Sequence, residues 1–166
     1  MMPSVSRSLI GTLEGCAIFG VTKFEVLRIE WLAKLAVCND GSGGNPDNDP
    51  CHQSQTAYYN NGDYLNPYEV PYIVVPPVII ESCEPIVLGC QGVIINVKNG
   101  LSTPAICGEV GPDEKIGEAS VEAAKRVGLS GSPNSGGTDL HEIAYAIWPG
   151  RPAVVDGKVY KLQGSA

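Results

Sequence analysis

Two glutamates in the second half of the chain have the residue type and spacing that acid–base chemistry requires. Glu109 lies in the glycine-rich stretch ICGEVGP, which follows a predicted strand, and Glu118 follows nine positions later, where a helix is predicted to begin. Carboxylates on two separate elements can face each other across a cleft. Glycosidic hydrolysis uses such a pair, with one acid to protonate the leaving oxygen and one base to activate water. Glutamates near turns and helix starts also serve as solvated or capping groups, so the spacing alone leaves both interpretations open.

Composition and charge limit the class of protein that carries this pair. The 166 residues are 43% hydrophobic and 17% charged, which indicates one globular domain. We expect an N-terminal segment over 1–22 and a single domain over 23–166. The net charge of −7 disfavours nucleic acid as a partner and would attract a cationic substrate. We expect a monomer with no membrane partner, since no apolar run is long enough to cross a bilayer.

The cysteines and the N-terminus give weaker indications of compartment. Six cysteines permit disulfides, and Cys38 and Cys51, which flank the start of a loop, are the best candidates for a bridge. The apolar surroundings of Cys16 and Cys107 predict buried thiols. Glu14 interrupts the only stretch that resembles a signal peptide, so export of a processed chain, export by another route and an intracellular location all stay open.

The elements that must position the glutamates are mostly strands. With 20 glycines and 13 prolines between short apolar runs, the sequence favours strands and turns over a helical bundle. One strand is expected within a loosely attached segment over the first 22 residues, and residues 117–127 form the predicted helix, with Gly128 as its stop. Residues 23–37 read as two short strands or one long bent strand, with a helix as the alternative. The other predicted strands are 72–75, buried on both faces; 93–97 and 102–107, a hairpin around Asn99-Gly100; 142–148; and 153–155 with 158–162, a closing hairpin around Asp156-Gly157.

A polar loop over 39–66 is too long to be a plain connection, which indicates a functional or partly mobile segment. Its acidic run imitates a calcium loop, but Pro50 stands where a glycine is needed and Thr56 where a glutamate is needed, so we reject a calcium site. We interpret His52 as a hydrogen-bonded loop histidine. The loop tyrosines could line a saccharide groove or pack beneath the loop, and Trp31 is predicted to be a core residue rather than a sugar platform.

Seven short motifs occur in a fixed order along the chain. They are KLAVCNDG, GNPD, QTAY, YEVPYIVVP, GEVGP, IGEAS and SPNSGGTD. Together they resemble the fungal-type chitosanases, glycoside hydrolase family 75, over about 31–149. The resemblance implies a mainly β (α+β) fold, a six-stranded double-psi β-barrel with additional hairpins and one helix. It also implies endo-hydrolysis of β-1,4-linked glucosamine polymer with inversion, and no cofactor or metal.

The resemblance carries the catalytic roles onto Glu109 and Glu118. Inversion requires their carboxyl groups to be roughly 6.5–9.5 Å apart. We expect Glu118 to be the acid, shielded by the tyrosine-rich loop, and Glu109 the base in a polar turn. The predicted substrate-binding residues are Asp40, Asp47, Tyr58, Asp113 and Trp148.

Two departures from the family pattern bear on activity. The first motif usually carries Asp where this chain has Glu109, and the added methylene displaces the carboxylate. Val37 replaces an acidic residue before Cys38, which leaves Asp40 to meet a substrate amine. A hydrolase of peptidoglycan or another aminosugar polymer is therefore an alternative function, and so is a non-catalytic carbohydrate-binding or structural barrel.

Overall fold

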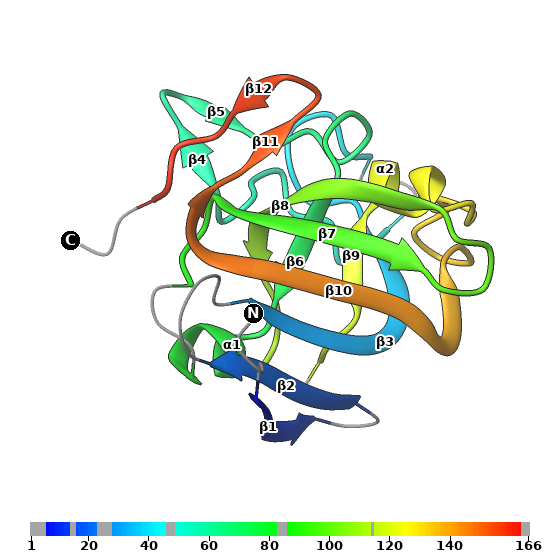
Figure 1. The fold of residues 1–166 in the computed structure, drawn as a ribbon. Helices are drawn as coiled ribbons and strands as arrows, with labels where there is room; N and C mark the ends of the chain where they lie inside the picture. Colours follow the sequence, from blue (N-terminus) through cyan, green and yellow to red (C-terminus); the bar gives the residue numbers. More distant parts are fainter. Residues whose placement is uncertain are drawn as a thin grey trace.

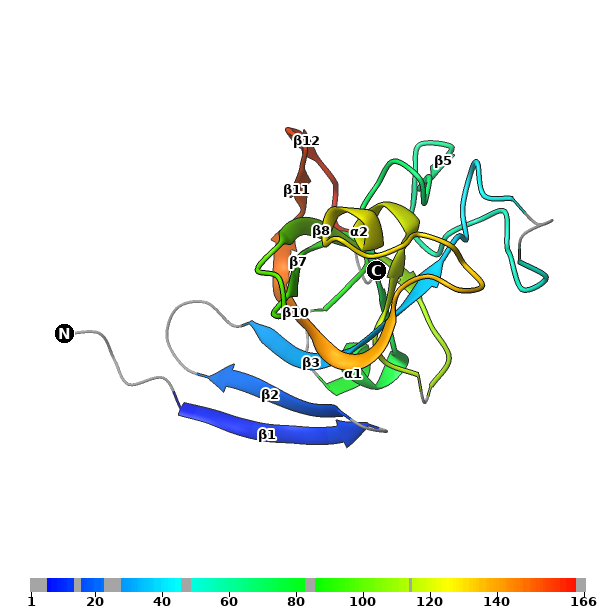
Figure 2. The same ribbon diagram turned by 90° about the vertical axis from the view of Figure 1, so that its right-hand side faces the viewer.

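A computed structural model describes residues 6–13, 16–22, 28–45, 49–82, 86–113 and 115–163, and six of its strands close into a barrel (Figure 1). The barrel closes because β9 pairs with both β6 and β3. Figure 2 shows the strands as a ring. In hydrogen-bonding order they are β3 (Ile29–Cys38), β10 (Thr138–Pro152), β7 (Cys90–Asn96), β8 (Ser102–Val110), β6 (Tyr72–Val75) and β9 (Glu118–Ser120). The predicted mainly β fold and six-stranded barrel are confirmed.

Alternating side chains build the barrel interior. On β3 the buried positions Trp31, Ala33 and Leu35 point inward, and their neighbours are more exposed. This two-residue period is that of a strand, so the helix considered for this segment is wrong from residue 29 onward. Residues 23–27 lie outside the described part of the chain. Strand β6 is buried on both faces, as predicted, because a second apolar cluster covers its outer face.

The predicted helix is shorter than expected. Helix α2 spans Val121–Arg126, and residues 118–120 form β9 instead. The chain is held extended there by pairing with β3 and β6. Ser120 begins the helix because its side chain accepts the Ala123 N–H, and Gly128, with φ of +79°, follows its end. A second helix, α1 (Pro77–Ser82), was not predicted.

The first 22 residues contain two strands rather than one. Strands β1 (Ser6–Leu13) and β2 (Cys16–Thr22) form an antiparallel hairpin, and β2 continues the sheet by pairing with β3 at residues 18–20 (Figure 1). The boundary at residue 22 stays a prediction. The described residues contain no helix long and apolar enough to cross a membrane.

Turn residues fix one hairpin of the barrel and two hairpins outside it. The β7–β8 hairpin is present as predicted. Strands β11 (Val154–Val155) and β12 (Lys158–Val159) form the closing hairpin, whose turn residues Asp156 and Gly157 both have positive φ. The long loop contains a hairpin that was not predicted, formed by β4 (Tyr59–Asn60) and β5 (Asp63–Tyr64).

The predicted disulfide is wrong. Cys38 and Cys51 are both free thiols, one buried and one exposed. The Cys38 sulfur lies at the end of β3, 3.4 Å from the Tyr72 hydroxyl oxygen, whereas Cys51 is in a surface turn. Cys107 is a buried thiol, as predicted, and the side chain of Cys16 lies outside the described part of the chain.

Candidate active site

The two candidate glutamates lie on strands that flank β6. Val74 of β6 pairs with Glu109 on β8 and with Glu118 on β9. Residues in register share one face of a sheet, so both glutamates lie on the outer face, where Val74 belongs to the second apolar cluster. Two inter-strand spacings separate their backbones, about 9–10 Å.

A β-bulge at Gly108 places Glu109 on that face. Ile73 pairs with Cys107, and Val74 then pairs with Glu109, so Gly108 is the extra residue. Without it, the alternation along β8 would direct Glu109 toward the barrel interior. A Cβ at Gly108 would lie 2.4 Å from the Leu65 Cδ1 atom, so a larger residue cannot be accommodated without movement. Glu109 is therefore near the end of a strand, not in the predicted turn.

Glu109 is partly buried and firmly held. Its Oε1 atom accepts hydrogen bonds from the N–H groups of Ala57, at 3.0 Å, and of Val110, at 2.9 Å. Burial raises the pKa of Glu109 to about 7, although these two bonds oppose the rise. The nearby charges of Asp40 and Glu118 raise it further. A carboxyl group with this pKa can hold a proton in weakly acidic solution.

Glu118 has a different balance of neighbours. Burial raises its pKa, and the Asp40 carboxylate adds to the rise. Lys115, a hydrogen bond with Cys38 and the charge of Lys34 all lower it. Glu118 does not lie at the start of a helix, as predicted, but on β9, and the acidic residue in the first turn of α2 is Glu122.

Asp40 lies close enough to the glutamate pair for its charge to raise the pKa of both. Its Oδ1 atom accepts the Gln53 N–H at 2.7 Å, which fixes the carboxylate. Beneath it, the Tyr72 hydroxyl donates to the Asp40 carbonyl oxygen at 2.7 Å. The site thus contains three carboxylates over a layer formed by Tyr72 and Cys38.

Among the residues that the structure describes, no other predicted binding residue has a side chain that hydrogen-bonds to the two glutamates or shifts their pKa values. Tyr58 is only 1% exposed, and its hydroxyl donates to the Lys161 carbonyl oxygen, so it packs beneath the loop. Asp113 is exposed in the β8–β9 connection. Trp148 lies on β10, two strands away from β8. Asp47 lies outside the described residues.

Two structural interpretations made from the sequence are confirmed, those of His52 and Trp31. The His52 Nδ1 atom is 2.9 Å from the Asn39 carbonyl oxygen, as expected of a hydrogen-bonded loop histidine. Trp31 is a core residue whose ring stacks on Tyr145 with centroids 5.3 Å apart. In the described part of the chain, no three His, Cys, Asp or Glu side chains are grouped so that they could hold a metal ion.

Sequence reasoning missed the residues that tune Glu118. Cys38 was interpreted as half of a disulfide, and Lys34 and Lys115 were given no role. Cys38 and Glu118 come together through the parallel pairing of β3 with β9, where Cys38 is in register with Ser120. The short KLAVC and IGEAS segments carry no local signal for this pairing.

Chemically, the arrangement supplies two carboxyl groups with raised pKa values, separated by one strand and supported by a third carboxylate. Such a set can donate a proton on one side of a bound substrate and accept one on the other. A family model described as fungal chitosanase of glycosyl hydrolase group 75 matches residues 35–165. No curated protein matches the chain.

Proposed function

Because the chain belongs to the fungal chitosanases of glycosyl hydrolase group 75 and is a glycosidase, we propose that it cleaves chitosan within the polymer by an inverting mechanism. Glu109 and Glu118 are the two catalytic groups. The observation that carries this proposal is their shared register with Val74. A backbone separation of about 9–10 Å fits the roughly 6.5–9.5 Å between carboxyls that leaves room for a water in inverting enzymes.

The surroundings of the two groups favour Glu109 as the acid, the reverse of the roles expected from the sequence. Its pKa of about 7 keeps it protonated in weakly acidic solution. The two backbone N–H groups occupy Oε1, so Oε2 is available to carry the proton. The rise in the Glu118 pKa is opposed by two lysines and a thiol, which favours the ionised form that a base requires.

The reaction then balances as a single displacement. Oε2–H of Glu109 donates its proton to the glycosidic oxygen as the bond from that oxygen to the anomeric carbon breaks. Glu118 accepts a proton from water, whose oxygen forms the new bond to the anomeric carbon from the opposite face. The products are a free hydroxyl group and a reducing end of inverted configuration. Proton exchange with solvent restores both carboxyls.

The substrate assignment rests on charge. Asp40 and the two glutamates form an acidic site, and the whole chain carries a net charge of −7, which attracts a polymer of protonated amines. We also propose that the barrel is of the double-psi type and that the protein acts outside the cell as a monomer, where a long polysaccharide is accessible.

The test is release of reducing ends from soluble chitosan, with the anomer followed by proton NMR during the first minutes. We expect release of reducing ends and a first product of inverted configuration. Release from peptidoglycan but not from chitosan would overturn the assignment of chitosan as the substrate.

Two alanine variants test the roles. Glu109→Ala should lose activity on chitosan but retain it on an oligosaccharide with a good leaving group, such as a nitrophenyl glycoside, which needs no acid. Glu118→Ala should be rescued by azide acting as the nucleophile. The opposite pattern would exchange the two roles.

A further inference from the structure

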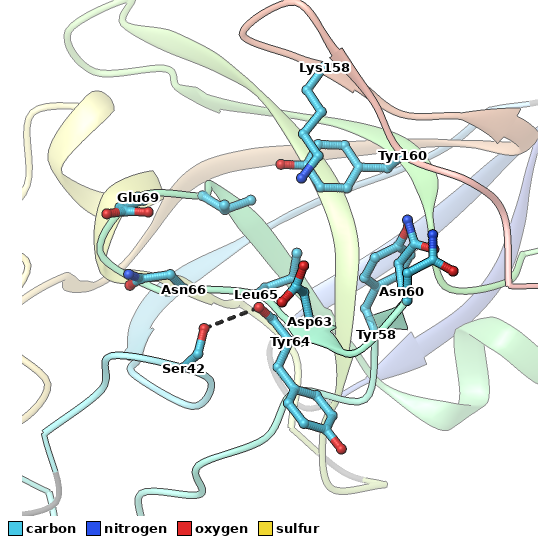
Figure 3. A pocket seen from close by; sticks show the side chains of 12 residues that line it. Ser42, Tyr58, Asn60, Asp63, Tyr64, Leu65, Asn66, Glu69, Lys158 and Tyr160 are labelled. Atoms are coloured by element: carbon cyan, nitrogen blue, oxygen red, sulfur yellow. Dashed lines mark hydrogen bonds between the residues drawn. The ribbon is translucent and has the colours of Figure 1, made fainter.

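A polar hollow of about 350 Å³ lies beside the glutamate pair, between the loop that contains β4 and β5 and the strand β12 with the residue that follows it (Figure 3). Asp40, Glu109 and Glu118 are not among its lining residues. Tyr58 and Leu65 separate the two places, since the Tyr58 N–H donates to the Gly108 carbonyl oxygen and Leu65 packs on Gly108. The hollow is therefore a neighbour of the catalytic site and not a part of it.

The lining is suited to a sugar. It presents the side chains of Asn60, Asp63, Asn66 and Glu69. Asn66 helps to hold the loop, because its Oδ1 atom accepts the Tyr68 N–H at 3.0 Å. Within the described part of the chain, the side chains of Asn60, Asp63 and Glu69 have no protein hydrogen-bond partner. Amides and carboxylates in this state can bind hydroxyl and amino groups of a ligand.

The charges in the hollow favour a cation. Asp63 and Glu69 supply two negative charges against one positive charge from Lys158. The Lys158 Nζ atom lies 4.8 Å from the centre of the Tyr160 ring. Figure 3 shows Asp63 and Lys158 reaching the hollow from opposite sides, from β5 and β12. Asp63 forms no ion pair with Lys158 among the described residues, so its carboxylate is available to an ammonium group.

The wall is also preformed. Asn61 and Gly62 both have positive φ, which sets the β4–β5 turn, and the rings of Tyr59 and Tyr64 pack with centroids 4.9 Å apart. A rigid wall lowers the cost of ordering side chains when a ligand binds.

We propose that this hollow is a second binding site for a glucosamine unit, whose ammonium group pairs with Asp63 or Glu69 and whose hydroxyls bond to the asparagine amides. This inference rests on the proposed function, since it takes its ligand from the same cationic polymer. A chain held in both places would be bound more tightly without a change in the chemical step.

The double variant Asp63→Asn/Glu69→Gln tests the site. The matched control is Glu81→Gln/Asp139→Asn, because it also removes one aspartate and one glutamate charge, from exposed positions outside the hollow. We expect the test variant to raise KM for soluble chitosan about tenfold with kcat unchanged, as loss of a charge-assisted contact predicts. Lys158→Gln should lower KM. Equal KM values for the test variant and the control would overturn the proposal.

Binding without turnover separates this inference from the proposed function. The glucosamine dimer, followed by backbone amide NMR, should shift signals of residues 60–66 in the wild type and leave them unmoved in the double variant. The N-acetylated dimer, which has no ammonium group, should shift them far less. Shifts at these residues without any chitosan hydrolysis would support the glucosamine site and contradict the proposed activity. Hydrolysis without such shifts would support the activity and contradict the glucosamine site.

Discussion

The inner and outer faces of β6 carry opposite kinds of chemistry one residue apart. Inward, Ile73 and Val75 belong to an apolar cluster to which all six barrel strands contribute. Outward, Val74 lies between two glutamates whose pKa values are raised by burial. Burying apolar surface favours folding, whereas burying a carboxylate opposes it. The closed interior thus supplies the stability that lets the outer face hold charged groups in partly dry surroundings.

The largest effect is expected on the outer face, when the catalytic carboxyls are replaced. Glu109→Gln and Glu118→Gln should each lower kcat by about 10²- to 10⁴-fold, because each removes a proton transfer from the transition state. Initial rates of reducing-end release measure the change. Glu122→Gln is the control, since Glu122 pairs with Arg126 on α2. Wild-type rates in either test variant would show that its carboxyl is not catalytic.

Two neighbouring valines compare the faces directly. Val75→Ala removes inward volume and should lower the free energy of unfolding by about 1–3 kcal/mol while leaving kcat unchanged in the folded protein. Val74→Ala should lower both the free energy of unfolding and kcat, because the Val74 side chain lies between the two glutamates. Urea unfolding and kcat at low temperature supply the two measurements. An equal loss of kcat in both variants would contradict the view that the inner face contributes stability and the outer face contributes catalysis.

Local patterns in the sequence predicted the elements, and long-range pairing determined the site. The β7–β8 hairpin and the buried strand β6 follow from turn residues and apolar runs, so both were predicted. Glu118 was placed on a helix because the segment is helix-like up to Gly128. Pairing of β9 with β3 and β6 overrode that preference. The bulge at Gly108 and the approach of Cys38 to Glu118 depend on the same pairings, for which single-sequence patterns give no register.

The pH dependence of stability isolates the cost of burying Glu109. Its folded pKa of about 7 lies above its ordinary value, so the folded state binds the extra proton between about pH 4.5 and 7 and loses stability as pH rises through that window. Glu109→Gln removes this loss. The variant should be more stable than the wild type by about 1–2 kcal/mol at pH 8, discounted for partial exposure, and equal to it at pH 4. Urea unfolding at both pH values measures it, and a pH-independent difference would contradict the raised pKa.

The smallest effect is expected for Cys38, which we compare with Cys107, a buried cysteine on the opposite face of the sheet. Cys38 forms a hydrogen bond with Glu118 that lowers the pKa of that carboxyl, whereas Cys107 belongs to the inner cluster. Cys38→Ala should therefore raise the Glu118 pKa and move the acidic limb of kcat/KM to higher pH. Cys38→Ser keeps a donor and should restore the limb. Cys107→Ala should lower stability without moving either limb, because its thiol faces the apolar interior.

If Cys38→Ala moves the alkaline limb instead, Glu118 is the group that must be protonated, and the acid and base are exchanged. If both alanine variants move the same limb equally, the shift comes from loosened packing, and Cys38 has no specific effect on the Glu118 pKa.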